Sequence, residues 1–215
     1  MHWSVLVDNA GALFAGLLIT LEVSILSFVF SFAIGVVVAV LRVTPSRLLN
    51  RAGTAYVEFI RNVPLLVEIF FFYFALPSVG IRFDGFWSGV CGLSIYTGAF
   101  FAEAIRSGIF AVPSGQLEAA EASGLSYTQA MRFVVLPQAI AMTIPPIGNT
   151  TLNMIKNSSL VSTVSVADIL GTANLLGGRT FAYTELLAGA ALLYLVITIP
   201  AALGINFTER RLAIR

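Results

Sequence analysis

The chain is poor in charged residues, which make up only 11% of its 215 positions, against about 25% in a typical soluble domain. Hydrophobic residues make up 58%, and the mean hydropathy is +0.91. No run of basic residues alternates with aromatic residues, so the sequence offers no nucleic-acid-binding surface. This composition predicts a protein whose surroundings are membrane lipid.

Residues that build common catalytic and metal sites are scarce. Cys91 is the sole cysteine and His2 the sole histidine, which excludes an intrachain disulfide framework and a Cys/His zinc site. A P-loop needs glycine directly before its lysine, but the single lysine, Lys156, follows Ile155. We therefore expect no catalytic residue, metal or cofactor in this chain. An intramembrane enzyme is disfavoured, since His2 near the N-terminus is the only histidine base.

Five stretches are apolar and long enough to cross a bilayer, which takes about 20 residues because each backbone polar group must be paired within the segment. The sequence therefore predicts an all-α polytopic membrane protein, with residues 1–215 as a single domain. Pro145 and Pro146 should unwind or kink the fourth span. The predicted spans cover residues 11–41, 56–77, 86–109, 137–155 and 186–207.

The basic residues predict the orientation, because Lys and Arg that flank spans stay in the cytosol. An odd number of spans also puts the two termini on opposite sides. We therefore expect the N-terminus outside and the C-terminus inside. Most basic residues then lie on the cytosolic side: Arg42, Arg47, Arg51, Arg61, Arg106, Arg132, Arg210, Arg211 and Arg215.

Two local patterns predict further structure. The polar stretch 157–179 contains Ser165-x-x-Asp168, typical of a capped helix start, so we expect a short helix near the outer surface, with a plain loop as the alternative. Small residues recur every fourth position in the first span, which favours the close approach of another helix in lipid. These are Ser27, Ser31, Gly35 and Ala39.

The segment 114–136, between the third and fourth spans, predicts two short helices joined by a bend. Ser114 is a candidate N-cap of the first helix, and Gly124 can end it in the left-handed conformation. Ser126-x-x-Gln129 has the form of a capping box for the second helix, and Pro137 should end that helix at the membrane. Exposed alanines beside glutamates would let the first helix seat in a groove of a partner with basic groups at its rim.

The same segment resembles the cytoplasmic motif of bacterial ABC importer permeases. It has Glu118-Ala119-Ala120, then three residues, Gly124, nine residues and Val134-x-Leu136-Pro137, and the family usually has Ile in place of Val134. Residues 56–67 and 156–160 resemble the branch that imports polar amino acids, and the likeness covers residues 11–209. It implies a type I ABC importer permease fold and an ATPase-docking role for Glu118, Ala119, Ala120, Gly124, Leu136 and Pro137.

The resemblance also implies partners. These are ABC ATPase subunits that bind ATP-Mg, a second permease chain that is identical or related, and a periplasmic amino-acid-binding protein, assembled in the bacterial inner membrane. Polar or charged amino acids would cross by alternating access. The alternative is a transporter or channel driven by an ion gradient, which would account for the spans but not for the segment 114–136.

Acidic residues inside spans cost about 2.5 to 3.5 kcal/mol or more unless they face protein or water. Glu103 has Arg106 three residues on, which predicts an ion pair, and Glu22 is a candidate packing residue. Glu68 stands where the family more often has Gln, and we hypothesise that it sets substrate selectivity.

The broken fourth span predicts a substrate pathway, because interrupted helices line such sites in transporters. Its polar residues are Asn149, Asn153, Lys156 and Asn157. Lys156 would attract a carboxylate or extend toward the outer interface. A kink without substrate contact is the alternative.

Overall fold

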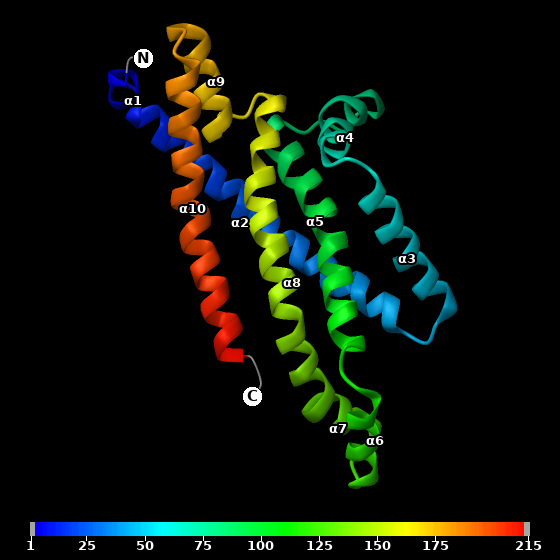
Figure 1. The fold of residues 1–215 in the computed structure, drawn as a ribbon. Helices are drawn as coiled ribbons and strands as arrows, with labels where there is room; N and C mark the ends of the chain where they lie inside the picture. Colours follow the sequence, from blue (N-terminus) through cyan, green and yellow to red (C-terminus); the bar gives the residue numbers. More distant parts are fainter. Residues whose placement is uncertain (1–2, 213–215) are drawn as a thin grey trace.

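Residues 3–212 are described by a computed structural model, in which they form helices joined by short loops, with no strand. The predicted all-α fold is confirmed. Figure 1 shows the long helices running side by side, with α2 crossing behind α5. The long helices are α2 (Ala10–Val43), α5 (Gly85–Phe110), α8 (Leu136–Asn157) and α10 (Tyr183–Leu212).

Shorter elements connect these helices. Four of the described helices are long and apolar enough to span a membrane, and a bent pair would supply a fifth span. The short α-helices are α1 (Ser4–Asp8), α3 (Arg47–Asn62), α4 (Leu65–Phe70), α6 (Ser114–Ala122), α7 (Tyr127–Ala130) and α9 (Ile169–Thr180). Two π-helical turns, η1 (Phe71–Ala75) and η3 (Met131–Val135), and two 3₁₀ turns, η2 (Leu76–Val79) and η4 (Ser158–Val164), complete the chain.

The second predicted span, residues 56–77, is not one straight helix. It is the end of α3, a break, and then α4 with its following turns, with a bend of 101° between the two parts. Val63 and Pro64 have ψ of 134° and are extended, because a residue before proline is pushed out of the helical region and proline lacks an N–H for the ladder. The helix that enters this break also begins earlier than predicted, at Arg47.

The small-residue stripe of the first span packs against α5, as predicted. All four of its residues are buried, and α2 packs more extensively against α5 than against any other described element. A Cβ added to Gly35 would lie 2.6 Å from the Cβ of Phe101, and one added to Gly98 would lie 2.7 Å from Cγ2 of Ile34. Larger side chains at these two positions would hold α2 and α5 further apart.

The polar stretch 157–179 contains the predicted short helix, α9, but its cap differs from the prediction. Asp168 is itself the N-cap, and its Oδ1 accepts the backbone N–H of Gly171 at 2.8 Å. Ser165 instead has φ of 65° and closes η4, so it lies too early to cap α9. Figure 1 places α9 and α1 at one end of the molecule, with α6 and α7 at the other.

The helix of the fourth predicted span, α8, continues through its two prolines. α8 is α-helical from Leu136 to Asn157 with Pro145 and Pro146 inside it, so the chain does not unwind there, and the kink that was the other predicted outcome stays a prediction. Prolines are tolerated inside membrane helices when neighbouring helices support the chain. α5 and α10 do so here: a Cβ added to Gly108 would lie 2.1 Å from Oγ1 of Thr143, and one added to Gly148 would lie 2.3 Å from Cγ2 of Ile205.

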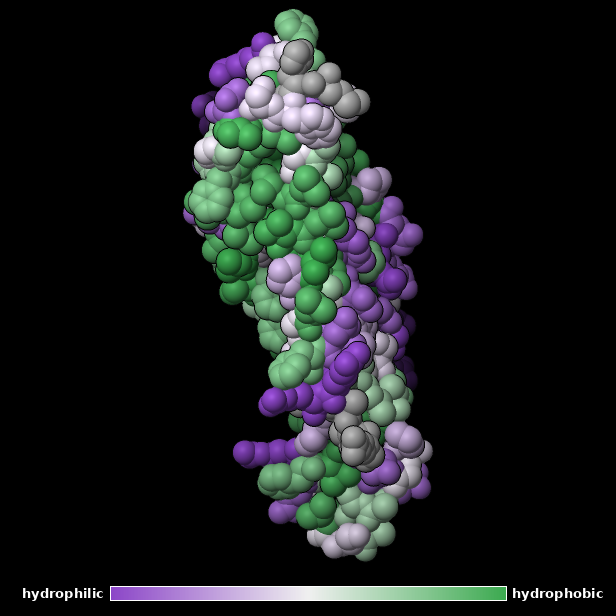
Figure 2. All heavy atoms as spheres, turned by 60° about the vertical axis from the view of Figure 1, so that its left-hand side comes forward, coloured by the Kyte–Doolittle hydropathy of each residue, from purple (hydrophilic) through white to green (hydrophobic). Residues whose placement is uncertain are grey.

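The surface matches a lipid-embedded body. Figure 2 shows a broad hydrophobic area over the upper and middle part of one face, with hydrophilic residues gathered along one side and lower down. α10 contributes exposed apolar side chains to the molecular surface, among them Leu195, Val196, Ile199 and Leu203. Hydrocarbon would cover such side chains at little cost.

Candidate functional site

The elbow, which we define as Ser114–Val135, projects beyond the long helices (Figure 1). Its bend is set by Gly124, whose φ is 89°. The N–H of Leu125 donates to the carbonyl of Ala120 at 3.2 Å, and that of Gly124 to the carbonyl of Glu121 at 2.9 Å. This pair of bonds is the Schellman motif, which satisfies the last carbonyls of a helix and needs a left-handed residue. Gly124 therefore ends α6 as predicted.

The second half of the elbow is joined rigidly to the membrane part. Ser126 and Gln129 form the predicted capping box. From there the chain is helical through α7, η3 and α8, so Pro137 does not end a helix as predicted. It is the second residue of α8, one residue after the π-helical turn. Ser114 does not cap α6 either, because it is already the first helical residue and Pro113 precedes it.

The residues predicted for docking do not share one environment. Glu118, Ala119, Gly124 and Pro137 are exposed, and Leu136 is 39% exposed. Ala120 is buried at 7% exposure, on a helix that packs against α7 and η3. It holds the elbow closed instead of offering a surface.

Sequence reasoning missed two exposed aromatic residues of the elbow. Tyr127 is 61% and Phe133 64% exposed. The aromatic residues themselves were visible between the predicted third and fourth spans, and aromatic side chains are enriched at the centres of protein interfaces.

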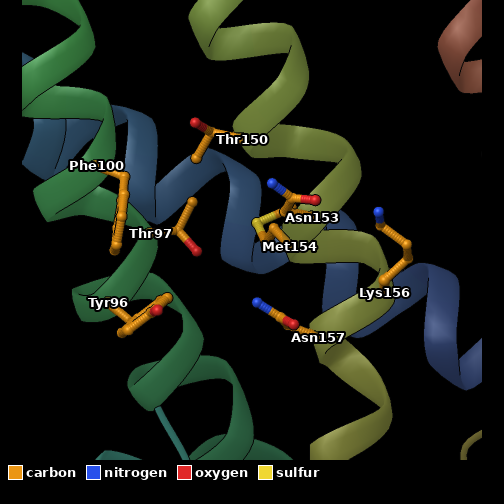
Figure 3. Close-up of a pocket in the computed structure, with 8 residues that line it drawn as sticks. All are labelled: Tyr96, Thr97, Phe100, Thr150, Asn153, Met154, Lys156 and Asn157. Carbon is orange, nitrogen blue, oxygen red and sulfur yellow. The ribbon is translucent and has the colours of Figure 1, made fainter. Parts of the chain in front are cut away.

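A polar cavity of about 370 Å³ lies between α5 and α8. Figure 3 shows Asn153 and Asn157 facing α5, while Lys156 extends from another side of α8. α5 contributes Tyr96, Thr97 and Phe100, and the Arg61 guanidinium lies 5.0 Å from the centre of the Phe100 ring. Its lining residues are Tyr96, Thr97, Phe100, Thr150, Asn153, Met154, Lys156 and Asn157.

The structure brings together three of the five residues predicted for the pathway. Asn153, Lys156 and Asn157 line the polar cavity. Asn149 is exposed one turn earlier on α8, and Glu68 lines a different cavity beside α3 and α4. Thr97 and Tyr96 were missed, although polar residues within the third span were visible in the sequence.

Glu103 forms the predicted ion pair and a second one. Its Oε1 accepts Nη2 of Arg106 at 2.6 Å, and its Oε2 accepts Nη1 of Arg42 on α2. The Arg42 carbonyl accepts the Asn50 side-chain amide at the start of α3. This group of contacts joins the end of α2, the start of α3 and the end of α5. Glu22, by contrast, is exposed on α2.

The fold, the elbow and the spans define a membrane component of a transport system, and comparison with known proteins agrees. Residues 31–214 match the family "Binding-protein-dependent transport system inner membrane component". The chain belongs to this family.

Relatives of known description are similar over nearly their whole length. The chain is 49% identical to the probable glutamine ABC transporter permease protein GlnM of Bacillus subtilis, over 99% of this chain and 98% of that one. It is 30% identical to the glutamate/aspartate import permease protein GltJ of Escherichia coli, over 98% and 94% of the two chains.

Solved structures agree with the fold. The crystal structure of an amino acid ABC transporter with histidines superposes with a TM-score of 0.93 at 32% identity, covering 98% of this chain and 99% of that one. The predicted ABC importer permease fold is confirmed. The methionine transporter MetNI matches at a TM-score of 0.81 and 22% identity, with 96% and 99% covered, and supports the fold alone.

Proposed function

We propose that this chain is the permease subunit of an ATP-driven importer for amino acids whose side chains are polar and uncharged or acidic. Relatives described as glutamine and as glutamate/aspartate permeases support the amino-acid class. The lining of the polar cavity supports the choice within it. Its polar groups are amides, hydroxyls and one ammonium, and among the described residues it has no carboxylate to attract a cationic side chain.

In this proposal Lys156 attracts the substrate carboxylate, and Asn153 and Asn157 bind its polar side chain. Amides can both donate and accept, so they suit a glutamine-like amide as well as a carboxylate. Asn149 would meet the substrate one turn earlier on α8. Glu68, if it affects selectivity, would act from outside this cavity.

The elbow is proposed to dock on an ABC ATPase that binds and hydrolyses ATP-Mg. Exposed Glu118 and Ala119, the bend at Gly124, and Leu136 and Pro137 beyond it would contact that subunit, with buried Ala120 keeping the bend rigid.

One observation carries the coupling mechanism: the helix that leaves the elbow is the helix that lines the cavity. α7, η3 and α8 run without a break from Tyr127 to Asn157. A push on the elbow would therefore move Asn153, Lys156 and Asn157 directly, which is what alternating access requires.

The remaining partners follow from the family. We propose a second permease chain, a periplasmic binding protein that delivers the amino acid, and location in the bacterial inner membrane with the N-terminus outside and the C-terminus in the cytosol. The end of α10 runs toward the elbow end of the molecule, as this orientation requires (Figure 1).

Copurification tests the docking proposal. Glu118→Lys should reduce recovery of a P-loop ATPase with the solubilised chain, whereas Glu58→Lys, an exposed glutamate on α3, should not. Gly124→Trp should also reduce recovery, since its left-handed backbone disfavours a side chain. Equal recovery in all variants, with uptake that persists after ATP depletion, would favour the ion-gradient alternative.

Uptake measurements test the pathway. Lys156→Met should raise KM for glutamate and for glutamine to a similar extent, because both carry the carboxylate that Lys156 attracts, and Asn153→Ala should also impair both. Glu68→Gln tests selectivity separately: an unchanged order of preference among basic, neutral and acidic amino acids would remove Glu68 from the pathway.

A further inference from the structure

The start of α3 carries two arginines that have no carboxylate partner among the described residues. Arg47 and Arg51 are exposed and four residues apart, so their side chains lie on one side of the helix. The ion pairs within the described part of the chain involve Arg42 and Arg106 instead. Two like charges at this spacing repel each other, and an anion bound between them would relieve the repulsion.

The turn from α2 into α3 fixes the position of these arginines. The Asn50 side-chain amide donates to the carbonyl of Arg42, and a Cβ added to Gly53 would lie 2.8 Å from Cγ of Arg42. Figure 1 shows this turn toward the elbow end of the molecule. In the orientation proposed above, Arg47 and Arg51 therefore lie near the cytosolic membrane surface, where anionic lipid head groups attract basic side chains.

The exposed side of α3 also has an apolar flank. Leu48, Ala52, Ala55 and Phe59 have the spacing of one helix face, and all four are exposed, Leu48 by 78% and Phe59 by 69%. Phe59 lies eight residues beyond Arg51, which is about 12 Å along the helix axis. α3 thus presents a basic end and an apolar flank to the same surroundings.

The apolar flank leads into two adjoining grooves. Phe59 lines a cavity of about 310 Å³ beside α3 and α4, and its wall is almost wholly apolar because the carboxylate oxygens of Glu68 are buried. A second apolar cavity, of about 410 Å³, lies between α2, α5 and η1. Phe72 and Ile95 line both cavities, so the two are adjacent. Such grooves suit hydrocarbon chains and not a polar solute.

These features together select one class of ligand. The two guanidinium groups suit a phosphate, to which arginine donates paired hydrogen bonds. The two grooves suit a pair of hydrocarbon chains. A lipid with a net negative head group offers both, whereas the ammonium of a zwitterionic head group would be repelled by the arginines.

We propose that α3 and the two adjoining grooves bind an anionic phospholipid. Arg47 and Arg51 bind its phosphate, and its acyl chains pass Ala55 and Phe59 and enter the grooves. Only the leaflet from which the lipid comes, the cytosolic one, rests on the proposed orientation. The binding itself does not depend on which solute is transported.

Native mass spectrometry of the full chain in detergent, titrated with phosphatidylglycerol or phosphatidylethanolamine, tests this proposal. Arg47→Gln/Arg51→Gln should weaken binding of phosphatidylglycerol roughly tenfold or more, because two arginines no longer attract the head group. Its binding of phosphatidylethanolamine should not change. Arg210→Gln/Arg211→Gln is the matched control, since it removes two exposed arginines at the end of α10 and should leave both lipids unaffected. Equal binding of phosphatidylglycerol in wild type and Arg47→Gln/Arg51→Gln would overturn the proposal.

Two further variants test the grooves while both arginines remain. Val67→Trp and Ala33→Trp each place a large ring in the mouth of one groove, where Val67 is 53% exposed and Ala33 is also exposed. Each should weaken binding of phosphatidylglycerol, whereas Leu195→Trp, on the exposed side of α10, should not. Undiminished binding in both groove variants would overturn the proposal.

The same spectra report whether a second permease chain covers this face instead. A permease pair that dissociates in Arg47→Gln/Arg51→Gln, while binding of phosphatidylglycerol stays unchanged, would assign α3 to a protein interface and overturn the proposal. Lipid binding in detergent is measured without transport. Its failure would therefore leave the proposed import function standing.

Discussion

Tyr194 donates a hydrogen bond from its hydroxyl to Oδ2 of Asp168 over 3.1 Å, joining α10 to the start of α9. Asp168 is fully buried, and its other oxygen accepts the N–H of Gly171. Thr20 on α2 adds a third contact, because its Oγ1 accepts the N–H of Ile169 at 3.1 Å. The helix α9 is thus fastened by polar contacts to both α2 and α10.

Tyr194→Phe should lower the free energy of unfolding by about 1 to 3 kcal/mol, because it leaves a buried carboxylate oxygen without its donor. Tyr183→Phe is the matched control on the same helix, since Tyr183 is 46% exposed. Chemical unfolding of both variants in the same detergent measures the difference. Equal losses would show that the hydroxyl of Tyr194 contributes nothing specific.

The stability should also depend on pH through Asp168. Burial raises the pKa of its carboxyl, against the opposing effect of the hydrogen bonds from Gly171 and Tyr194. A raised folded pKa means that the folded chain holds the proton more tightly. The contribution of Asp168 to the free energy of unfolding is therefore complete below the pKa that its carboxyl has in the unfolded chain, about 4. It is lost as pH rises through the pKa that the carboxyl has in the folded chain.

Asp168→Asn tests this dependence, because Asn keeps the N-cap but does not titrate. Its stability relative to wild type should improve from pH 4 to pH 7. Asp84→Asn is the control: Asp84 caps α5 by accepting the N–H of Trp87 at 2.8 Å, but it is exposed. A gap between wild type and Asp168→Asn that is constant across this range would contradict the assignment.

Glu103→Gln should destabilise the chain by about 3 kcal/mol, because it leaves Arg42, whose side chain is 10% exposed, with an uncompensated charge. Arg106→Gln should cost less, about 1 kcal/mol, since the Arg106 side chain is 32% exposed and Glu103 keeps its bond to Arg42. Thermal unfolding of the two variants gives the comparison. Similar losses would mean that Arg42 does not depend on Glu103.

Much of this architecture was visible in the sequence because its signals are local. The apolar runs predicted α2, α5, α8 and α10, and Gly124 with the capping box predicted the bend of the elbow. The Glu103–Arg106 pair also followed from its spacing within one helix. Each of these features is determined by residues a few positions apart.

The features that the sequence did not reveal depend on residues far apart in the chain, or on whether one helix runs on into the next. Arg42 reaches Glu103 from a different helix, and the polar cavity exists only because Thr97 on α5 faces Asn153 and Asn157 on α8. Pro64 and Pro145 are both prolines inside a predicted span, yet the helix is interrupted at the first and continues through the second. The first lies at a break, whereas the second lies in a helix packed between α5 and α10.

Gly35→Ala should destabilise the chain by about 1 to 3 kcal/mol through overpacking. The new Cβ would lie 2.6 Å from the Phe101 Cβ and 3.2 Å from the backbone N of Ala102, neither of which can move without shifting α5. Gly204→Ala is the matched control, since a Cβ there meets nothing within 4 Å and alanine favours a helix by about 0.5 to 1 kcal/mol. Unfolding of both variants in one detergent would measure the contrast. If Gly35→Ala were as stable as Gly204→Ala, close contact between α2 and α5 could not be what requires glycine at position 35.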